Sequence, residues 1–217
     1  MGLHVEQIAV GGFDDNFSYV IVDEDSQQAA IVDPSGDIQK VFSYVEQHDL
    51  SVVQILVTHS HFDHVDRLGE CLAQYSVPVY MHTNACSRIE ADDTYKCCIE
   101  DKHTIPLGDA SIQVVFTPGH TEDSVCFLLS REQNSDHVPK LITGDTLFVE
   151  GCGRTSEPLV RDLYQSLQTL KQLEEDTQVY PGHDYGSIPI STIKHEKERN
   201  KYFLAQDFEE FRKIRLG

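Results

Sequence analysis

The segment THSHFDH, residues 58–64, places three histidines and an aspartate directly after the apolar run VVQILV. Imidazole nitrogens together with carboxylate oxygens are typical ligands of zinc, iron and manganese, and no thiolate stands nearby to suggest a structural zinc site. Alternate side chains of an extended segment share a face, so His59, His61 and Asp63 are predicted to point into one cavity and His64 toward another side of it. The segment therefore predicts a metal site.

Three more segments have the same design, because each ends an apolar strand pattern and then delivers a histidine or an aspartate in a loop marked by Gly or Pro. They are VVFTPGHT, LITGDTLF and VYPGHDYG. A lone histidine is usually an ordinary polar residue, but that explanation would have to hold at four strand ends at once. We therefore predict one shared metal centre. Its predicted ligands are His59, His61, Asp63, His64, His120, Asp145 and His183.

The other histidines and the cysteines carry no such pattern. The six cysteines have irregular spacings and no C-x-x-C pair, which indicates neither a zinc finger nor a disulfide framework. Most, including Cys152, are predicted to be small core residues, while Cys97 and Cys98 receive no assignment. The histidines predicted to be structural or surface residues are His4, His48, His82, His103, His137 and His195.

Alternating strands and helices must position these residues. Three short strand patterns open the chain, and a helix over 36–50 with Asp37 as its N-cap follows them. A βαβ alternation comes next, formed by strand 52–58, helix 65–75 and strand 77–82. The opening strands are predicted at 4–10, 17–23 and 29–34.

The second half returns to strands and ends in helices. The leucine stripe at helical spacing over 159–173 predicts core packing. The whole pattern predicts an α/β fold of two packed sheets flanked by helices, in a single domain spanning 1–217. The remaining predicted elements are strands 112–117, 124–130, 140–144 and 177–181, a turn at 131–137, and helices 191–200 and 207–213.

Composition narrows the class of partner. The chain has 17 Lys and Arg against 36 Asp and Glu, a net charge of −19 that repels nucleic acid and anionic membranes. No signal-peptide pattern and no membrane-spanning apolar run are seen, so a cytoplasmic location is expected. The oligomeric state stays open, with a homodimer among the options.

The pattern H-x-H-x-D-H followed in order by TPGHT, TGDTLF and YPGHD resembles the metallo-β-lactamase superfamily over most of the chain. This resemblance implies an αββα sandwich of two mixed β-sheets with the metal site at one edge of the sheets. It also implies an enzyme, and a small-molecule thiol substrate derived from glutathione.

Two branches of the superfamily compete. The stretches DNFSYVIVDED, VDPSGD and GDTLFVEGCGR look like glyoxalase II, a thioesterase that cleaves hydroxyacylglutathione. GCGRT and YPGHDYGSIPISTIKHEKERN look like the persulfide dioxygenases, which oxidise a persulfide to sulfite with O₂. Glyoxalase II usually has a larger helical C-terminal region than the short stretch after His183, so the dioxygenase is preferred and the thioesterase is the alternative.

The two resemblances imply different metals. The dioxygenase family holds one Fe(II) per chain on the matches to His59, His120 and Asp145, and the other four predicted ligands would orient that set. The thioesterase resembles a hydrolase with two Zn ions. In that reading His59, His61 and His120 hold one ion, Asp63, His64 and His183 hold the other, and Asp145 bridges them.

Three residues are also predicted to act on substrate or in catalysis: Asp63, Arg154 and Tyr185. Arg154 matches a family arginine beside the site, and Tyr185 directly follows His183 and Asp184. The chain departs from the family at Asp66, Arg67, Glu122 and Asp123, and the extra acid argues against an anionic thiol such as glutathione. A non-catalytic metal-binding module is the third alternative.

Overall fold

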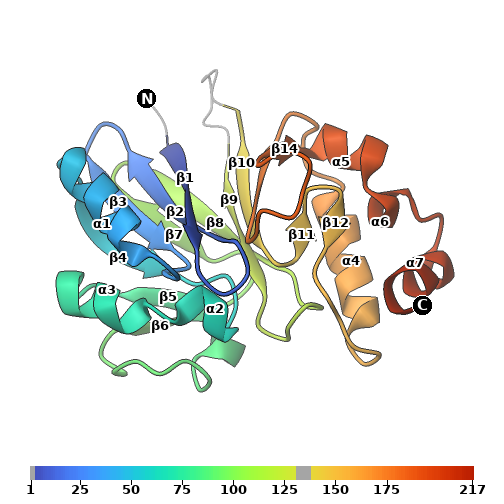
Figure 1. Ribbon diagram of the computed structural model, residues 1–217, viewed down its shortest axis with the longest axis horizontal. Helices are drawn as coiled ribbons and strands as arrows, with labels where there is room; N and C mark the ends of the chain where they lie inside the picture. The colour runs from blue at the N-terminus through green and yellow to red at the C-terminus, as the bar shows by residue number, and fades with distance from the viewer. Residues whose placement is uncertain (1–2, 131–137) are drawn as a thin grey trace.

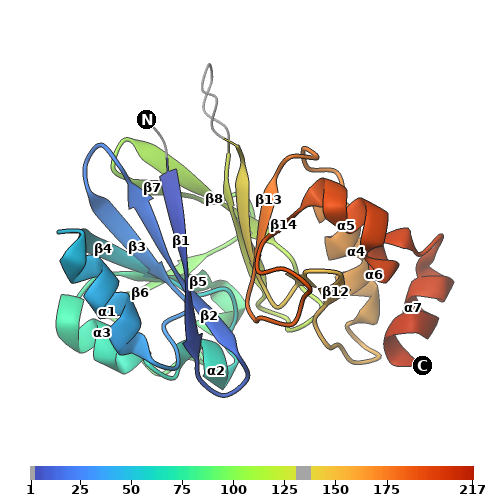
Figure 2. The ribbon, with the colours of Figure 1, turned by 45° about the horizontal axis from the view of Figure 1, so that its top comes forward.

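The computed structural model describes residues 3–130 and 138–217. Two six-stranded mixed sheets face each other, and helices cover the outer face of each one (Figures 1 and 2). This is the predicted sandwich. The turn expected at 131–137 and the residue His137 lie outside the described residues.

The first sheet is built from the N-terminal half of the chain. Its first three strands pair antiparallel, and each later strand pairs parallel with the strand before it, through crossovers that contain α1, α3 and η1. In spatial order its strands are β1 (Leu3–Gly11), β2 (Asn16–Asp23), β3 (Gln28–Val32), β4 (Ser51–Leu56), β5 (Val79–His82) and β6 (Lys96–Ile99). Its helical segments are α1 (Ile38–Gln47), α2 (Phe62–Val65), α3 (Leu68–Tyr75) and η1 (Thr83–Ala85).

The second sheet uses the C-terminal half and is antiparallel except where β10 pairs with β13. Its strands, in spatial order, are β14 (Ser191–Thr192), β13 (Gln178–Pro181), β10 (Lys140–Gly144), β9 (Val125–Leu129), β8 (Ala110–Phe116) and β7 (Thr104–Leu107). A hairpin of β11 (Leu147–Phe148) and β12 (Gly151–Cys152) and the helices α4 (Val160–Leu170), α5 (Ile193–Arg199), α6 (Lys201–Leu204) and α7 (Phe208–Leu216) complete it.

Three apolar layers hold the sandwich together. Tyr19 and Phe127 are fully buried in the layer between the sheets. Val41 belongs to the layer under α1 and α3. Leu163 and Leu167, from the predicted leucine stripe, belong to the layer under α4. Burial of these side chains is the main favourable contribution to folding, and it fixes the loops at the sheet edges.

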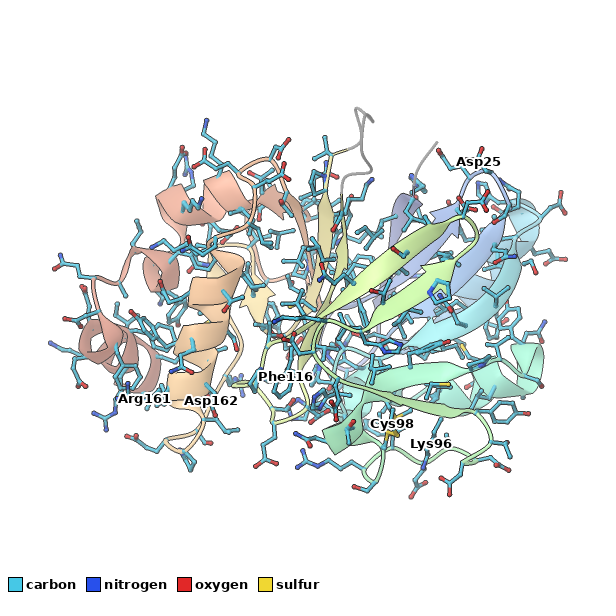
Figure 3. All side chains as sticks on the ribbon, turned by 180° about the vertical axis from the view of Figure 1, so that it is seen from behind. Asp25, Lys96, Cys98, Phe116, Arg161 and Asp162 are labelled. Carbon is cyan, nitrogen blue, oxygen red and sulfur yellow. A yellow bond between two sulfur atoms is a disulfide. The ribbon has the colours of Figure 1, made fainter. Side chains whose placement is uncertain are left out.

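The prediction about disulfides was wrong. Cys86 and Cys98 form a disulfide with their Cα atoms 6.2 Å apart (Cys98 is labelled in Figure 3). Parallel pairing of β5 with β6 brings the segment after β5 against Cys98, a proximity that cysteine spacing alone does not reveal. Cys71, Cys126 and Cys152 are buried as predicted.

Among the described residues, no helix is both long enough and apolar enough to cross a membrane.

Candidate metal centre

Three imidazoles from two sheets form the first group of ligand atoms. His61 Nδ1 lies 3.1 Å from His59 Nε2 and 2.9 Å from His120 Nε2. His59 and His61 follow β4, while His120 lies in the loop between β8 and β9. Lone pairs that converge at this distance need a proton or a cation between them, and three of them suit a metal ion.

The second group joins Asp63, His64 and His183. Asp63 Oδ2 lies 3.6 Å from His64 Nε2 and 3.5 Å from His183 Nε2, and the two imidazole nitrogens are 3.2 Å apart. The expectation that Asp63 points with His59 and His61 was therefore wrong. The chain stops being extended at Phe62, where α2 begins. In a helix, neighbouring side chains are about 100° apart and not on opposite faces as in a strand, so the adjacent residues Asp63 and His64 can contact the same group of ligands.

Asp145 lies between the two groups, directly after β10. Its Oδ2 is 3.4 Å from His120 Nε2, and its Oδ1 is 3.3 Å from His64 Nε2 and 3.2 Å from His183 Nε2. Oδ1 is buried and has no hydrogen-bond partner in the described part of the chain. When His64 and His183 are neutral and turn their Nε2 lone pairs toward it, this ionised oxygen is buried without a donor, which is costly, and a cation would remove that cost.

The outer nitrogens of four imidazoles are held by hydrogen bonds. When Nδ1 donates outward, Nε2 keeps its lone pair facing the centre, which is the form that binds a metal. The contacts are His59 Nδ1 to Thr58 Oγ1 at 3.1 Å, His64 Nδ1 to Asp33 Oδ2 at 3.0 Å, His120 Nδ1 to the Arg154 carbonyl at 2.8 Å and His183 Nδ1 to the Asp14 carbonyl at 2.6 Å.

Burial and neighbouring charge separate the pKa values of these groups. Burial lowers the pKa of His59 and of His120, which favours their neutral, ligand-competent form. For His64, burial acts in the same direction but the Asp145 and Asp33 carboxylates outweigh it, so its pKa is raised well above the ordinary value. Burial raises the pKa of Asp145, but the charge of His64 outweighs it, so this pKa lies well below the usual range.

Sequence reasoning missed the polar residues behind the ligands. Asp33 accepts hydrogen bonds from the Thr58 backbone and hydroxyl at 2.8 and 2.6 Å, in addition to its contact with His64. Asn16 donates to Asp63 Oδ2 at 3.0 Å. Asp123 accepts from the Ser60 backbone nitrogen at 2.7 Å. Asp33 belongs to the VDPSGD stretch that carries the family resemblance, but nothing in that motif indicates its contact with His64.

Two glycines leave room for the ligands. A Cβ atom on Gly182 would lie 2.4 Å from Asp145 Oδ1 and 2.9 Å from His64 Cε1. A Cβ atom on Gly153 would lie 2.0 Å from the Asp145 carbonyl and 2.9 Å from His120 Nδ1. Any side chain at these positions would push a ligand out of place.

Arg154 and Tyr185, both predicted to meet substrate, line one cavity of about 440 Å³ beside the centre. The Tyr185 ring stacks on His183 at 4.8 Å, and its hydroxyl donates to the Asp14 carboxylate. Lys201 and Arg215 line the same cavity. Within the described residues, neither Arg154 nor Lys201 has an acidic side chain within ion-pair distance.

The unusual acids in the loops are paired or committed to hydrogen bonds. Asp66 Oδ1 accepts from the Gly36 backbone at 3.1 Å, and Asp66 also pairs with Arg67. Glu122 and the fully buried Asp123 share Arg88. These contacts weaken the argument that the acids would repel an anionic substrate. Of the histidines predicted to be structural or surface residues, the five that the structure describes belong to none of the candidate ligand groups; they are His4, His48, His82, His103 and His195.

Comparison with known proteins agrees with this geometry. A family model described as the metallo-beta-lactamase superfamily matches residues 11–183, which include every candidate ligand. The probable polyketide biosynthesis zinc-dependent hydrolase BaeB of Bacillus velezensis is 35% identical over 90% of this chain and 85% of its own. The hydroxyacylglutathione hydrolase of Hahella chejuensis is 37% identical over 83% of this chain and 66% of its own. The structure of ETHE1 from Myxococcus xanthus has a TM-score of 0.84 at 29% identity, covering 99% of this chain and 90% of that one.

Proposed function

The chain belongs to the metallo-β-lactamase superfamily, and from that premise we propose that it is a hydrolase that uses two metal ions to cleave a thioester. One observation carries the proposal. The two oxygens of Asp145 face different groups of ligands, His120 on one side and His64 with His183 on the other. A carboxylate in this position suits a bridge between two ions. The curated relatives described above are named as hydrolases, which supports the same choice.

Two ions at these groups would lower the pKa of a shared water and polarise the thioester carbonyl. The residues of the chain prepare that chemistry. The outward hydrogen bonds of His59 and His120 fix the imidazoles with Nε2 toward the centre. The lowered pKa of Asp145 keeps its carboxylate ionised at neutral pH. The ionised form is the one that could bind two cations at once.

The cavity beside the centre would hold the thiol carrier. Arg154, Lys201 and Arg215 give it three cationic side chains in a chain whose net charge is −19. Its two acidic side chains, Asp14 and Glu150, are hydrogen-bonded to Tyr185 and His195. A guanidinium binds a carboxylate or phosphate through two hydrogen bonds, so Arg154 would anchor an anionic carrier such as glutathione. Tyr185, stacked on His183, would form the wall between carrier and centre.

A persulfide dioxygenase with one Fe(II) on His59, His120 and Asp145 is the second candidate, and one observation favours it. His61 is exposed, and its Nε2 makes no hydrogen bond to another described residue, unlike the outer nitrogens of the other four imidazoles. A ligand without a hydrogen bond on its outer nitrogen is held less firmly. Without His61, the metal ligands of this site would be His59, His120 and Asp145.

The test begins with metal-free protein loaded separately with Zn and, without oxygen, with Fe(II). Metal content is measured by mass spectrometry, hydrolysis is followed with S-acylglutathione, and O₂ uptake is followed with glutathione persulfide. We expect two metal ions per chain and hydrolysis, both lost in Asp145→Asn and kept in Asp93→Asn, which changes an exposed aspartate in a distant loop. One iron per chain with rapid O₂ uptake would support the dioxygenase in place of the hydrolase.

A further inference from the structure

Two phenylalanine side chains stand in solvent next to the metal centre. Phe13 is 86% exposed and Phe62 is 74% exposed, the highest values among the large apolar side chains of the described residues. Neither ring packs against another aromatic ring in that part of the chain. Scattered exposed apolar residues are common, but a pair at a catalytic centre suggests a binding surface.

Each ring is tied to the centre by its neighbours in the chain. Phe62 lies between two candidate ligands, His61 and Asp63. Phe13 precedes Asp14, whose carbonyl accepts the hydrogen bond from His183 Nδ1 at 2.6 Å. The turn between β1 and β2 that carries Phe13 lies beside α2, which begins at Phe62 (Figures 1 and 2). A hydrogen bond of 3.0 Å from Asn16 to Asp63 joins the two segments.

The rings line a groove of about 710 Å³ with the buried residues Val10 and Ile38 also contributing to its wall. Three of the four charged residues of the same groove are engaged with one another, and the fourth, Asp37, stands at the start of α1. Arg67 pairs with Glu70 at 2.9 Å and with Asp66 at 3.3 Å. These ion pairs leave the phenyl rings as the large exposed apolar side chains of the groove that are available to a ligand.

The turn between β1 and β2 separates this groove from the cationic cavity. Phe13 lines the groove, and its neighbour Asp14 lines the cavity that holds Arg154 and Lys201. A thioester has two arms, the acyl group and the thiol carrier, which diverge from the carbonyl carbon. With the anionic carrier anchored at Arg154, the acyl arm would extend from the carbonyl carbon toward the rings.

We propose that the groove lined by Phe13 and Phe62 binds the acyl group of the substrate and selects an extended apolar chain over a short one. This inference rests on the proposed thioesterase function. Burial of apolar surface supplies its free energy, which grows with each methylene group that meets the rings.

The experiment compares S-acetylglutathione with S-octanoylglutathione as substrates of the metal-loaded enzyme. The measured quantity is the ratio of kcat/KM for octanoyl to kcat/KM for acetyl. We expect a ratio well above one for the unchanged chain, falling by about tenfold in Phe13→Ser and in Phe62→Ser. The control is Leu204→Ser, because Leu204 is 54% exposed on α6 and lines neither cavity, and it should keep the ratio of the unchanged chain.

The outcomes separate the two proposals. A ratio near one, or an equal ratio in the phenylalanine variants and the unchanged chain, would overturn the acyl site while the thioesterase stands. No hydrolysis of either substrate by protein shown to hold its metal would overturn the thioesterase and the acyl site with it. Because both rings are exposed, we expect the variants to fold, and thermal melting checks that expectation.

Discussion

His64 is fully buried between two carboxylates, so its protonation is coupled to metal binding. Burial alone would lower the pKa of His64. The Asp145 and Asp33 carboxylates have the larger effect, so the pKa lies well above the ordinary 6.5. In metal-free protein the protonated form therefore adds stability that is complete below pH 6.5 and is lost as pH rises through the raised pKa. A metal ion binds the neutral imidazole and must displace this proton.

We accordingly predict that zinc binding to metal-free protein at neutral pH releases protons and becomes tighter as pH rises. The measurement is isothermal titration calorimetry in two buffers that differ in ionisation enthalpy. The apparent binding enthalpy should differ between the buffers by an amount that reports the released protons. Equal enthalpies in both buffers would show that His64 is already neutral.

Gly182 offers a second test at the scale of one residue. Gly182→Ala places a methyl group 2.4 Å from Asp145 Oδ1, so we expect metal affinity to fall by about 10- to 100-fold as the carboxylate is displaced. Competition with a chromophoric chelator measures it. Gly69→Ala is the matched control, because its Cβ would meet no atom within 4 Å and the change lies in α3. Unchanged affinity in Gly182→Ala would mean that Asp145 is free to move.

At the scale of elements, the loop after β4 is held from behind by a buried carboxylate. Asp123 accepts from the Ser60 backbone at 2.7 Å and from Arg88 at 3.1 Å, and Arg88 lies two residues after the disulfide-bonded Cys86. The ligands His59 and His61 flank Ser60. The position of the loop therefore depends on the segment that follows η1.

Removing this support should loosen the loop. We expect Asp123→Ala to lower the free energy of unfolding by about 2 kcal/mol and to weaken metal binding, because it leaves the partly buried Ser60 backbone N–H and the Arg88 guanidinium without this acceptor. Urea unfolding and metal competition measure the two effects. Glu122→Ala is the control, since its ion pair with Arg88 is exposed and should contribute less than about 1 kcal/mol. Equal effects of the two variants would contradict the role given to Asp123.

The elements also show what the sequence can and cannot predict. The longer strands and helices were predicted because period-two and helical apolar patterns report a buried face. KCCI at 96–99, TIPL at 104–107 and the two-residue strands were missed, since their pairing comes from the neighbouring strand and not from their own pattern. The candidate ligands were found at strand ends. Strand periodicity alone did not divide them into two groups, because α2 begins at Phe62, whereas the resemblance to the thioesterases implied that division. The supporting residues Asp33 and Asp123 were not predicted, because their contacts with Thr58 and Ser60 span 25 and 63 residues of the chain.

At the scale of the molecule, the candidate ligands come from both sheets. His59 to His64 follow β4 of the first sheet, whereas His120, Asp145 and His183 belong to loops of the second. An ion bound to both sets would resist their separation.

Metal removal should therefore destabilise the whole fold. At free metal concentrations of about 100 times Kd, binding adds about 2.7 kcal/mol, which corresponds to a rise in Tm of about 5–10 °C for a chain of this size. Calorimetric scans of metal-loaded protein and protein treated with chelator measure it. If the chelator removes the metal and Tm does not change, a metal ion that links the two sheets is contradicted.

Each sheet is drawn from one continuous stretch of chain, residues 3–99 for the first and 104–192 for the second. During synthesis the first sheet can emerge from the ribosome and pair its strands while the second is still being translated. The last candidate ligand, His183, is translated 119 residues after His64. A nascent chain can therefore present His59, His61, Asp63 and His64 early, but it cannot enclose an ion between both groups until the second sheet has docked. An ion held by both groups of ligands would therefore mark a chain whose two sheets have docked, in contrast to a nascent chain that has formed only the first sheet.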